Sequence, residues 1–504
     1  MKLTHKQIYQ FLQARPQVSA KRPDDPLTSL TWDSREARPA GIFVAIKGEH
    51  SDGNEYLPDA LAKGASLLIA SRPSPPSLLQ AVGQAGAGLI EATDPEFVIG
   101  EIARLWRGSL AARVVGVTGS SGKTSTKELI ASVLGTAYRV TKNQGNYNNL
   151  LGLPYTVLEC GTEDDFLVLE MGMQQFGEIS RYAEISSPEI AVVTNIGLAH
   201  LELLGSQEAI AQAKAELLLA LPDGKGAAVL NGDDSYTEYL IEYSNLYKRN
   251  IEVLKFGFHG ENTVSAKNIQ FSASGMPRFD LVIGNQAVEG IQMQTPGEHN
   301  VKNALAAAAV GCYLSLPPDL IAQGIMETKT LALRSEVIDA GNMQIINDTY
   351  NANPDSVRAA LKALQQMDVS RPHIAVLGDM LELGPSEQEL HRQIGIEALS
   401  MGLSLLIAVG SRGAWIAEGA RSGNALQGRS QGLPVISVDD WQEAVQLLLG
   451  EFDRSPIILV KASRSMGFER IVESLVMKAA DSCTDTSGQA RDILIRDEGV
   501  LKDQ

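Results

Sequence analysis

The chain has 504 residues, of which 44% are apolar and 20% charged, and its formal net charge is −17. These proportions predict a soluble globular protein whose length requires two to four domains. Because nucleic acids and membrane surfaces are polyanionic, the acidic balance argues against either as a nonspecific partner. A small anionic ligand is still compatible with this charge, since a single pocket can be positive inside an acidic protein.

The cysteines and the N-terminal sequence indicate a cellular compartment. Cys160, Cys312 and Cys483 lie far apart and form no CxxC pair, which favours a reducing compartment over a disulfide framework or a thiolate zinc site. The N-terminus is charged where a signal peptide would be apolar, and the most apolar stretch, residues 304–316, is too short to span a bilayer. We therefore expect a cytoplasmic, monomeric protein without a membrane span or a nucleic-acid partner.

The first two blocks of the chain both alternate apolar runs with helix-like sequence. In residues 1–111 the runs are short, and the proline-rich segment 71–77 predicts a surface connection. In residues 112–328 the runs are longer, and each ends in glycine or a polar residue. They lie at 113–119, 166–172, 191–197 and 227–233. This pattern is typical of a parallel sheet that is buried on both faces and carries its active residues at the carboxyl ends of the strands.

The third block, residues 329–480, repeats the alternation. Its apolar β runs are separated by amphipathic helical stretches such as 356–367 and 441–450. We therefore predict a second doubly wound, Rossmann-like α/β domain. Residues 481–504 are polar and weakly patterned, which predicts a flexible tail.

The strongest local motif is GVTGSSGKT, residues 116–124, between a predicted strand and a predicted helix. Glycines let backbone N–H groups approach phosphate oxygens, and the helix N-terminus adds the positive end of its dipole. Lys123 would reach the β and γ phosphates of ATP, and the Thr124 hydroxyl would bind Mg²⁺. Val117 stands where the common pattern has its first glycine, which disfavours a GTPase or motor ATPase. The residues expected to hold the nucleotide are Gly119, Ser120, Ser121, Gly122, Lys123, Thr124 and Ser125.

This loop, TGSSGKTST, resembles that of the Mur ligases, the amide-forming enzymes of peptidoglycan assembly, and of the related folylpolyglutamate synthases. Further segments match the family in the same order: NQGNYNNLLGLP (143–154), LEMG (169–172), TNIGLAHLELLGS (194–206), PGEHNVKNALAAAA (296–309), LRSE (333–336), NDTYNANPDS (347–356), GDMLELG (378–384) and VKASRSMGFE (460–469). The resemblance implies three α/β domains. They are a small UDP-precursor-binding module, a central phosphate-loop domain with a parallel sheet, and a C-terminal Rossmann-like domain that binds an amine.

The resemblance also implies a centre with two Mg²⁺ ions held by Thr124, Glu170, His200 and Lys214. Glu170 ends an apolar strand, where a carboxylate suits a metal better than packing. Lys214 resembles a family lysine that CO₂ converts to a carbamate, which is an anionic ligand. From the residues alone, a salt bridge for Glu170, a structural role for His200 and a solvated Lys214 are the alternatives.

Asparagines and an arginine complete the implied catalytic set. Asn148 and Asn149 match residues near the γ phosphate and the activated carboxylate, with a turn-forming role as the alternative. Arg334 matches an arginine that reaches the γ phosphate when the domains close, with an interdomain ion pair as the alternative. Asn300 and Asn303, which follow His299 at the start of the alanine-rich helix, are implied to read adenine, although Asn300 is also a plausible helix cap.

The remaining implied contacts lie in the third and first blocks. The residues implied to contact adenine, ribose and the second substrate are Asp348, Tyr350, Asn351 and Asn353. The residues implied to contact the amine substrate are Lys461, Ser463 and Arg464. Residues 32–60 resemble a UDP-sugar module whose motif positions are Asp33, Ser34, Arg35, Asp52 and Gly53. Related sequences usually have histidine where this chain has Asn54.

Within the family, NDTYNANPDS and GDMLELG are most like the branch that joins D-alanyl-D-alanine to UDP-N-acetylmuramoyl-tripeptide. The implied activity is therefore ATP-dependent amide formation through an acyl phosphate. The alternatives are a sister ligase that adds a single amino acid, a folylpolyglutamate synthase, a phosphotransferase or GTPase, and a catalytically silent Mur-like subunit.

Overall fold

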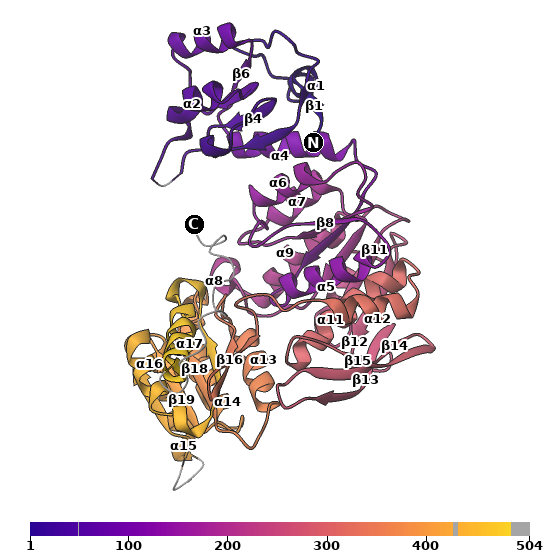
Figure 1. Ribbon diagram of the computed structural model, residues 1–504. Helices are drawn as coiled ribbons and strands as arrows, with labels where there is room; N and C mark the ends of the chain where they lie inside the picture. The colour runs from indigo at the N-terminus through magenta and orange to yellow at the C-terminus, as the bar shows by residue number, and fades with distance from the viewer. Residues whose placement is uncertain (49, 427–431, 485–504) are drawn as a thin grey trace.

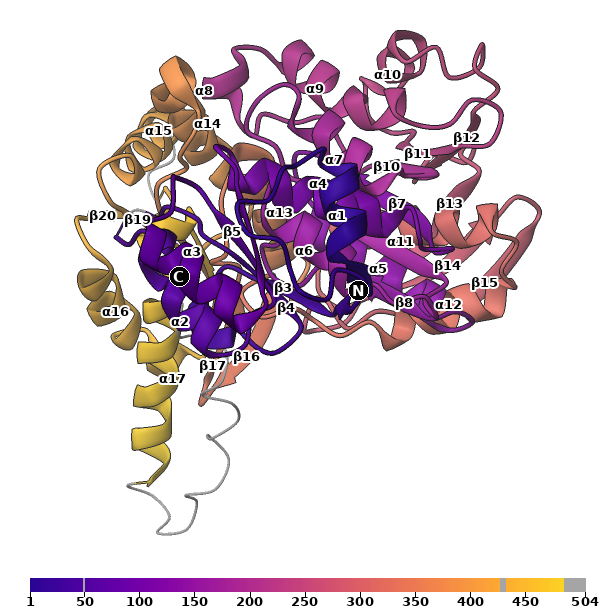
Figure 2. The same cartoon turned by 90° about the horizontal axis from the view of Figure 1, so that it is seen from above.

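The computed structural model describes residues 1–48, 50–426 and 432–484, and these residues form three α/β domains (Figure 1). The N-terminal and C-terminal domains both contact the central one. Figure 1 shows the C-terminal domain beside the antiparallel hairpins of residues 264–292, and Asp368 N of that domain donates to the Ala273 carbonyl at 2.9 Å. Figure 2, the view from above, shows the N-terminal domain in front of the other two. The prediction of a three-domain α/β fold is confirmed.

The N-terminal domain has a four-stranded parallel sheet in the order β3-β4-β5-β6. Its strands are β3 (Ser29–Thr31), β4 (Gly41–Val44), β5 (Leu67–Ala70) and β6 (Gly88–Glu91), and β1 (Leu3–Thr4) pairs separately with β2 (Pro26–Leu27). Its helices are α1 (His5–Phe11), α2 (Leu57–Ala62), α3 (Pro76–Ala85) and α4 (Pro95–Arg107). α3 begins inside the proline-rich segment that predicted a connection, because proline is well suited to the first turn of a helix.

The central domain has a nine-stranded sheet in the order β15-β14-β13-β12-β11-β10-β7-β9-β8. Six neighbouring strands of this sheet are parallel to one another. They are β7 (Arg113–Thr118), β8 (Val140–Lys142), β9 (Phe166–Glu170), β10 (Ile190–Val193), β11 (Ala227–Asn231) and β12 (Glu252–Gly257). β13 (Val264–Phe271), β14 (Pro277–Ile283) and β15 (Gln286–Gln292) then extend the sheet as antiparallel hairpins, which the sequence did not predict.

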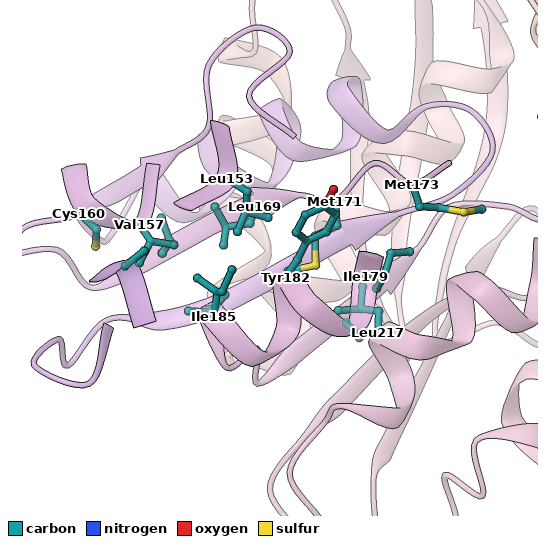
Figure 3. Close-up of a cluster of buried hydrophobic side chains, with 14 of the residues drawn as sticks. Leu153, Val157, Cys160, Leu169, Met171, Met173, Ile179, Tyr182, Ile185 and Leu217 are labelled. Atoms are coloured by element: carbon teal, nitrogen blue, oxygen red, sulfur yellow. The ribbon is translucent and has the colours of Figure 1, made fainter. Parts of the chain in front are cut away.

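Helices cover both faces of the central sheet. They are α5 (Lys123–Gly135), α6 (Gly152–Glu159), α7 (Glu178–Ser186), α8 (Leu201–Leu204), α9 (Gln207–Leu219), α10 (Thr237–Tyr243), α11 (Glu298–Tyr313) and α12 (Pro318–Glu327). Along β7, Val114 packs with α4, α6, α7 and α9, whereas Val115 packs with α5, α11 and α12, because successive side chains point to opposite faces. Figure 3 shows the first of these cores, where Leu169 of β9 lies beside Leu153, and Leu217 lies beside Ile179.

The C-terminal domain has a six-stranded sheet in the order β16-β17-β21-β18-β19-β20, parallel except for β16. The strands are β16 (Glu336–Ala340), β17 (Met343–Asn347), β18 (His373–Leu377), β19 (Leu405–Val409), β20 (Val435–Val438) and β21 (Ile457–Lys461). The helices are α13 (Pro354–Gln365), α14 (Glu387–Ala398), α15 (Gly413–Leu426), α16 (Trp441–Leu449) and α17 (Glu469–Thr484). They form one core on each face, as a doubly wound domain requires.

The predicted tail begins inside α17, which extends to Thr484. The rest of that prediction, residues 485–504, lies outside the described residues. None of the helices in the described part of the chain has the length and apolar content to cross a membrane.

Candidate active site

The turn between β7 and α5 depends on two glycines with positive φ. Gly119 has a φ of 150°, and Gly122, the residue before α5, has a φ of 76°. A Cβ on Gly119 would overlap the Thr194 hydroxyl, and one on Gly122 would lie 2.5 Å from Asn303 Oδ1. The two positions therefore require glycine, and the turn packs closely against the end of β10 and against α11.

Asn195, just after β10, holds the backbone of this turn. The N–H groups of Ser120 and Ser121 donate to Asn195 Oδ1 at 3.0 and 2.9 Å, and Asn195 Nδ2 donates to Ser121 Oγ at 2.6 Å. Asn195 lies within the family segment 194–206 but is absent from the predicted site residues. An amide at a strand end has no distinctive pattern, so only its geometry identifies it.

Lys123 is the first residue of α5 and points back over the turn. Its Nζ donates to the carbonyl of Gly119 at 3.0 Å. Burial lowers the pKa of Lys123 from its ordinary value, while the nearby Glu170 carboxylate opposes that shift. The ammonium therefore lies in a site where a phosphate would replace much of the solvation that it has lost.

Glu170 ends β9 beside Lys123 and presents one free carboxylate oxygen. Its Oε1 accepts a hydrogen bond from Asn148 Nδ2 at 2.8 Å, whereas its buried Oε2 has no hydrogen-bond partner among the described residues. A buried anionic oxygen without a donor suits a hard cation such as Mg²⁺. No cluster of three His, Cys, Asp or Glu side chains is close enough to hold a metal within the described ranges, so any cation here needs ligands of other kinds as well.

The two adjacent asparagines have different environments. Asn148 contacts the Glu170 carboxylate, as described above. The Oδ1 of Asn149 instead accepts from Gly152 N at 2.8 Å and Leu151 N at 3.2 Å, at the start of α6. The carboxamide oxygen of Asn149 therefore stabilises a turn, which is the alternative role predicted for this residue. Asn149 also lines the cavity.

His200 lies at the contact between the central and C-terminal domains. It has a φ of 64°, and its Nδ1 is 2.7 Å from Oε2 of Glu382, which itself has a φ of 63°. The imidazole holds the pKa of Glu382 below its ordinary value, against the opposing effect of burial. Two non-glycine residues in the left-handed region facing each other indicate a contact that the surrounding structure enforces.

Other hydrogen bonds between these domains converge on the same region. Asp355 Oδ2 accepts from Leu198 N at 3.0 Å, and Asn353 Nδ2 donates to the Ser120 carbonyl at 3.4 Å. Asp355 and Glu382 lie in segments that carried the family resemblance but were not predicted as site residues. Their roles depend on how two domains dock, which strand and helix patterns do not encode.

Lys214, on α9, is 1% exposed, so the alternative of a solvated helix-face lysine is wrong. Burial lowers its pKa well below the ordinary value, and the nearby Lys123 ammonium adds to the effect. No carboxylate forms a salt bridge with it in the described part of the chain. A neutral amine buried beside a cation is therefore the form that this environment favours.

The C-terminal domain contributes one wall of a cavity of about 650 Å³ over the phosphate loop. The guanidinium of Arg334 lies over the ring of Tyr350, 3.8 Å from its centroid. Arg334 stands between Leu333 and Ser335, whose φ values are 63° and 50°, and Ser335 N donates to Asp348 Oδ1 at 3.1 Å. The lining includes these predicted residues from both domains: Ser120, Ser121, Gly122, Lys123, Thr124, Ser125, Asn148, Asn149, Glu170, His200, Asn300, Asn303, Arg334, Asp348, Tyr350, Asn351, Asn353 and Lys461.

The three predicted amine-binding residues form hydrogen bonds or ion pairs with other residues of the C-terminal domain. Lys461 Nζ donates to Asp348 Oδ2 at 2.6 Å and to the Asn351 carbonyl at 2.8 Å. Ser463 Oγ accepts from Leu381 N at 3.0 Å, and Arg464 pairs with Glu469 at 3.3 Å. Lys461 lines the cavity, whereas Ser463 and Arg464 do not.

The start of α11 forms another part of the wall. Asn303 Nδ2 donates to Asn300 Oδ1 at 3.0 Å, and Asn300 Nδ2 donates to the Pro296 carbonyl at 2.8 Å. Asn303 Oδ1 accepts from the Thr126 hydroxyl at 3.3 Å. Both amides therefore brace α11 against the segment before it and against α5.

His299 lies beside these asparagines, and its environment predicts that the stability of the protein depends on pH. Burial lowers its pKa from 6.5 to about 4, so between these values the unfolded chain binds more protons than the folded one. Stability conferred by neutral His299 is thus present above pH 6.5 and is lost as the pH falls toward 4. Between pH 7 and pH 4.5 we expect the free energy of unfolding of His299→Gln to fall by on the order of 2 kcal/mol less than that of wild type, as measured by urea unfolding at both pH values. The same loss in His299→Gln as in wild type would contradict the assignment, and exposed His50→Gln is the control.

The predicted UDP-binding residues lie in the N-terminal domain, away from the lining of this cavity. Asp33 caps η1 (Ser34–Glu36) and pairs with Arg35 at 2.7 Å, which lowers the pKa of Asp33. Asp52 caps η2 (Gly53–Tyr56), and a Cβ on Gly53 would lie 2.6 Å from the backbone of Ile46. Asn54 Nδ2 donates to Ser71 Oγ at 2.6 Å, so it ties this turn to the end of β5.

Comparison with known proteins agrees with this arrangement. Family models match residues 26–107 (Mur ligase family, catalytic domain), 117–311 (Mur ligase middle domain) and 333–464 (Mur ligase, glutamate ligase domain). The chain belongs to the Mur ligase family. The predicted family membership is therefore confirmed.

Individual Mur ligases resemble the chain over nearly its whole length. The UDP-N-acetylmuramoyl-tripeptide–D-alanyl-D-alanine ligase of Bacillus subtilis is 34% identical over 455 residues, which cover 89% of this chain and 93% of that protein. A crystal structure of MurF from Acinetobacter baumannii has a TM-score of 0.82 at 28% identity and covers 95% of this chain and 99% of its own. MurF from Thermotoga maritima, solved in complex with ADP, has a TM-score of 0.77 at 26% identity, with 90% and 99% coverage.

Proposed function

We propose that this Mur ligase joins D-alanyl-D-alanine to UDP-N-acetylmuramoyl-tripeptide in an ATP-dependent reaction of peptidoglycan precursor synthesis. The observation that carries the proposal is one cavity in which the phosphate loop, Lys123 and Glu170 meet Arg334 from another domain. The choice of substrates rests on the relatives with 34% identity, which bear this activity in their names. A cytoplasmic location and a monomeric state are part of the same proposal.

The reaction needs activation because a carboxylate is a poor acyl donor. Its oxygen attacks the γ phosphorus of ATP, the bond to the β-phosphate oxygen breaks, and an acyl phosphate and ADP form. The amine of D-alanyl-D-alanine then attacks the acyl carbon and loses a proton, and the tetrahedral intermediate expels inorganic phosphate. Lys123 and Arg334 stabilise charge on the transferred group, and the docked C-terminal domain excludes water from the acyl phosphate.

Magnesium fits the residues on the loop side of the cavity. The free Oε2 of Glu170 and the Thr124 hydroxyl are oxygen ligands of the kind that Mg²⁺ prefers, and His200 lines the same cavity. When bound, the ion would neutralise charge on the β and γ phosphates. We include in the proposal that the neutral Lys214 amine combines with CO₂, releasing one proton, and that the resulting carbamate serves the second ion.

Product mass tests the proposal against its rivals. With ATP, Mg²⁺, UDP-N-acetylmuramoyl-tripeptide and D-alanyl-D-alanine, we expect a product heavier than the tripeptide by one dipeptide less water. Parallel reactions with D-alanine and with L-glutamate should give no product. Preference for a single amino acid would indicate a sister ligase, and absence of both product and ADP would indicate a catalytically silent subunit.

A further inference from the structure

Lys127 is a buried charge that the proposed mechanism does not use. It lies four residues after Lys123 on α5, hence on the same helix face, and is 1% exposed. Its Nζ donates to the carbonyl of Asn143 at 2.6 Å and lies 3.0 Å from Oε1 of Glu128. Because a buried ion pair is often no better for stability than an apolar residue of the same size, a specific contact explains Lys127 better than packing does.

Asn143 is that contact, and its side chain continues the β ladder. The backbone pairing of β8 with β9 ends at Lys142, opposite Val168. Beyond it, Asn143 Oδ1 accepts from Glu170 N at 2.9 Å, and Asn143 Nδ2 donates to the Glu170 carbonyl at 3.0 Å. The buried carboxamide therefore pairs with Glu170 as the peptide group of a neighbouring strand would.

The same carboxamide also fixes the loop that holds the Glu170 side chain. Asn143 Nδ2 donates to the carbonyl of Tyr147 at 2.9 Å. The next residue, Asn148, donates to Glu170 Oε1 at 2.8 Å and accepts from Gly172 N at 3.1 Å. The Asn143 carboxamide therefore fixes the backbone of Glu170 directly and its carboxylate through the loop. Oε2 of Glu170 stays without a hydrogen bond from any described residue.

We propose that Asn143 and Lys127 are positioning residues that aim the Glu170 carboxylate at the nucleotide-bound cation. Lys127 holds the backbone of Asn143, and Asn143 holds Glu170 from two sides. This inference rests on the proposed function, because it assumes that Glu170 faces a divalent cation. Neither residue lines the cavity, so neither contacts the substrates.

Lys127→Met tests the proposal in the full-length protein. Methionine keeps the volume but leaves the Asn143 carbonyl and Glu128 Oε1 without this donor, so we expect the urea midpoint to fall, and the variant is assayed where it is fully folded. We expect Mn²⁺ affinity in the presence of ADP, measured by electron paramagnetic resonance, to fall about 10-fold and kcat for ligation to fall 10- to 100-fold, with KM for D-alanyl-D-alanine unchanged. Asn143→Ala should show the same losses of affinity and kcat, and it keeps the proposal testable if Lys127→Met fails to fold.

Lys142→Met is the matched control, because Lys142 also pairs with Glu128 but does not contact the Asn143 carbonyl. It should retain wild-type Mn²⁺ affinity and kcat. Wild-type Mn²⁺ affinity in Lys127→Met or Asn143→Ala, or an equal loss in Lys142→Met, would overturn the proposal. The Mn²⁺ measurement needs no acceptor substrate, so an error in the proposed amine or acid would not affect it.

Discussion

Lys123→Ala is expected to lower kcat for ligation on the order of 10³-fold while leaving binding of the UDP-precursor unchanged. The ammonium lies over the phosphate loop, 3.0 Å from the Gly119 carbonyl and close to Glu170, so in the proposed reaction its loss removes the cation that meets the transferred phosphoryl group. The predicted UDP contacts are in another domain, outside the cavity that Lys123 lines. Coupled ADP release measures the rate, and isothermal titration with the UDP-precursor measures the binding.

Replacement of exposed Lys267 by alanine is the control for this experiment, because it also removes one lysine but lies on β13. It should leave both quantities at the wild-type level. Near-normal turnover of Lys123→Ala would contradict the assignment of the phosphate loop.

Lys214→Met is expected to lower kcat on the order of 10²-fold or more without unfolding the protein. The lysine is buried and its pKa is lowered well below the ordinary value, which favours the neutral amine that the proposed reaction with CO₂ requires, and methionine fills the same space without that chemistry. Exhaustive removal of CO₂ from the wild-type enzyme should lower its activity, and added bicarbonate should restore it. After equilibration with ¹³C bicarbonate, NMR should show a carbamate resonance in wild type that is missing from Lys214→Met.

Lys225→Met serves as the comparison, since Lys225 is exposed. It should keep the carbamate resonance and the dependence on bicarbonate. Full activity of Lys214→Met, or wild-type activity that does not respond to CO₂ removal, would show that the amine acts unmodified or not at all.

Strands with a buried core on both faces were readily predicted from the sequence. β7, β9, β10 and β11 all correspond to continuous apolar runs that end in glycine or a polar residue. The hairpins β13–β15 were not predicted, because they lie at the end of the sheet, contain polar residues throughout and have no continuous apolar run. Polar strands at the end of a sheet take much of their stability from pairing with neighbouring strands, which local sequence does not report.

The site was predicted as far as motifs identify single residues. Glu170 and Lys123, which line the cavity, could be predicted as candidates because strand ends and glycine-rich turns have recognisable patterns. The burial of Lys214 could not be predicted from the sequence of α9. Alanine and leucine occur on all sides of this helix, so its sequence does not show which side faces solvent. Glu382 and Asp355 were missed because their partners, His200 and Leu198, belong to another domain.

The central claim is that the phosphate loop presents the terminal phosphoryl group of ATP to a carboxylate. An ¹⁸O label in the terminal carboxyl group of the UDP-precursor tests it directly. If an acyl phosphate forms, the oxygen that bridges carbon and phosphorus leaves with the phosphate, so each turnover should place one carboxyl oxygen in the inorganic phosphate, detected by mass. Unlabelled phosphate, with the amide product still formed, would contradict the account.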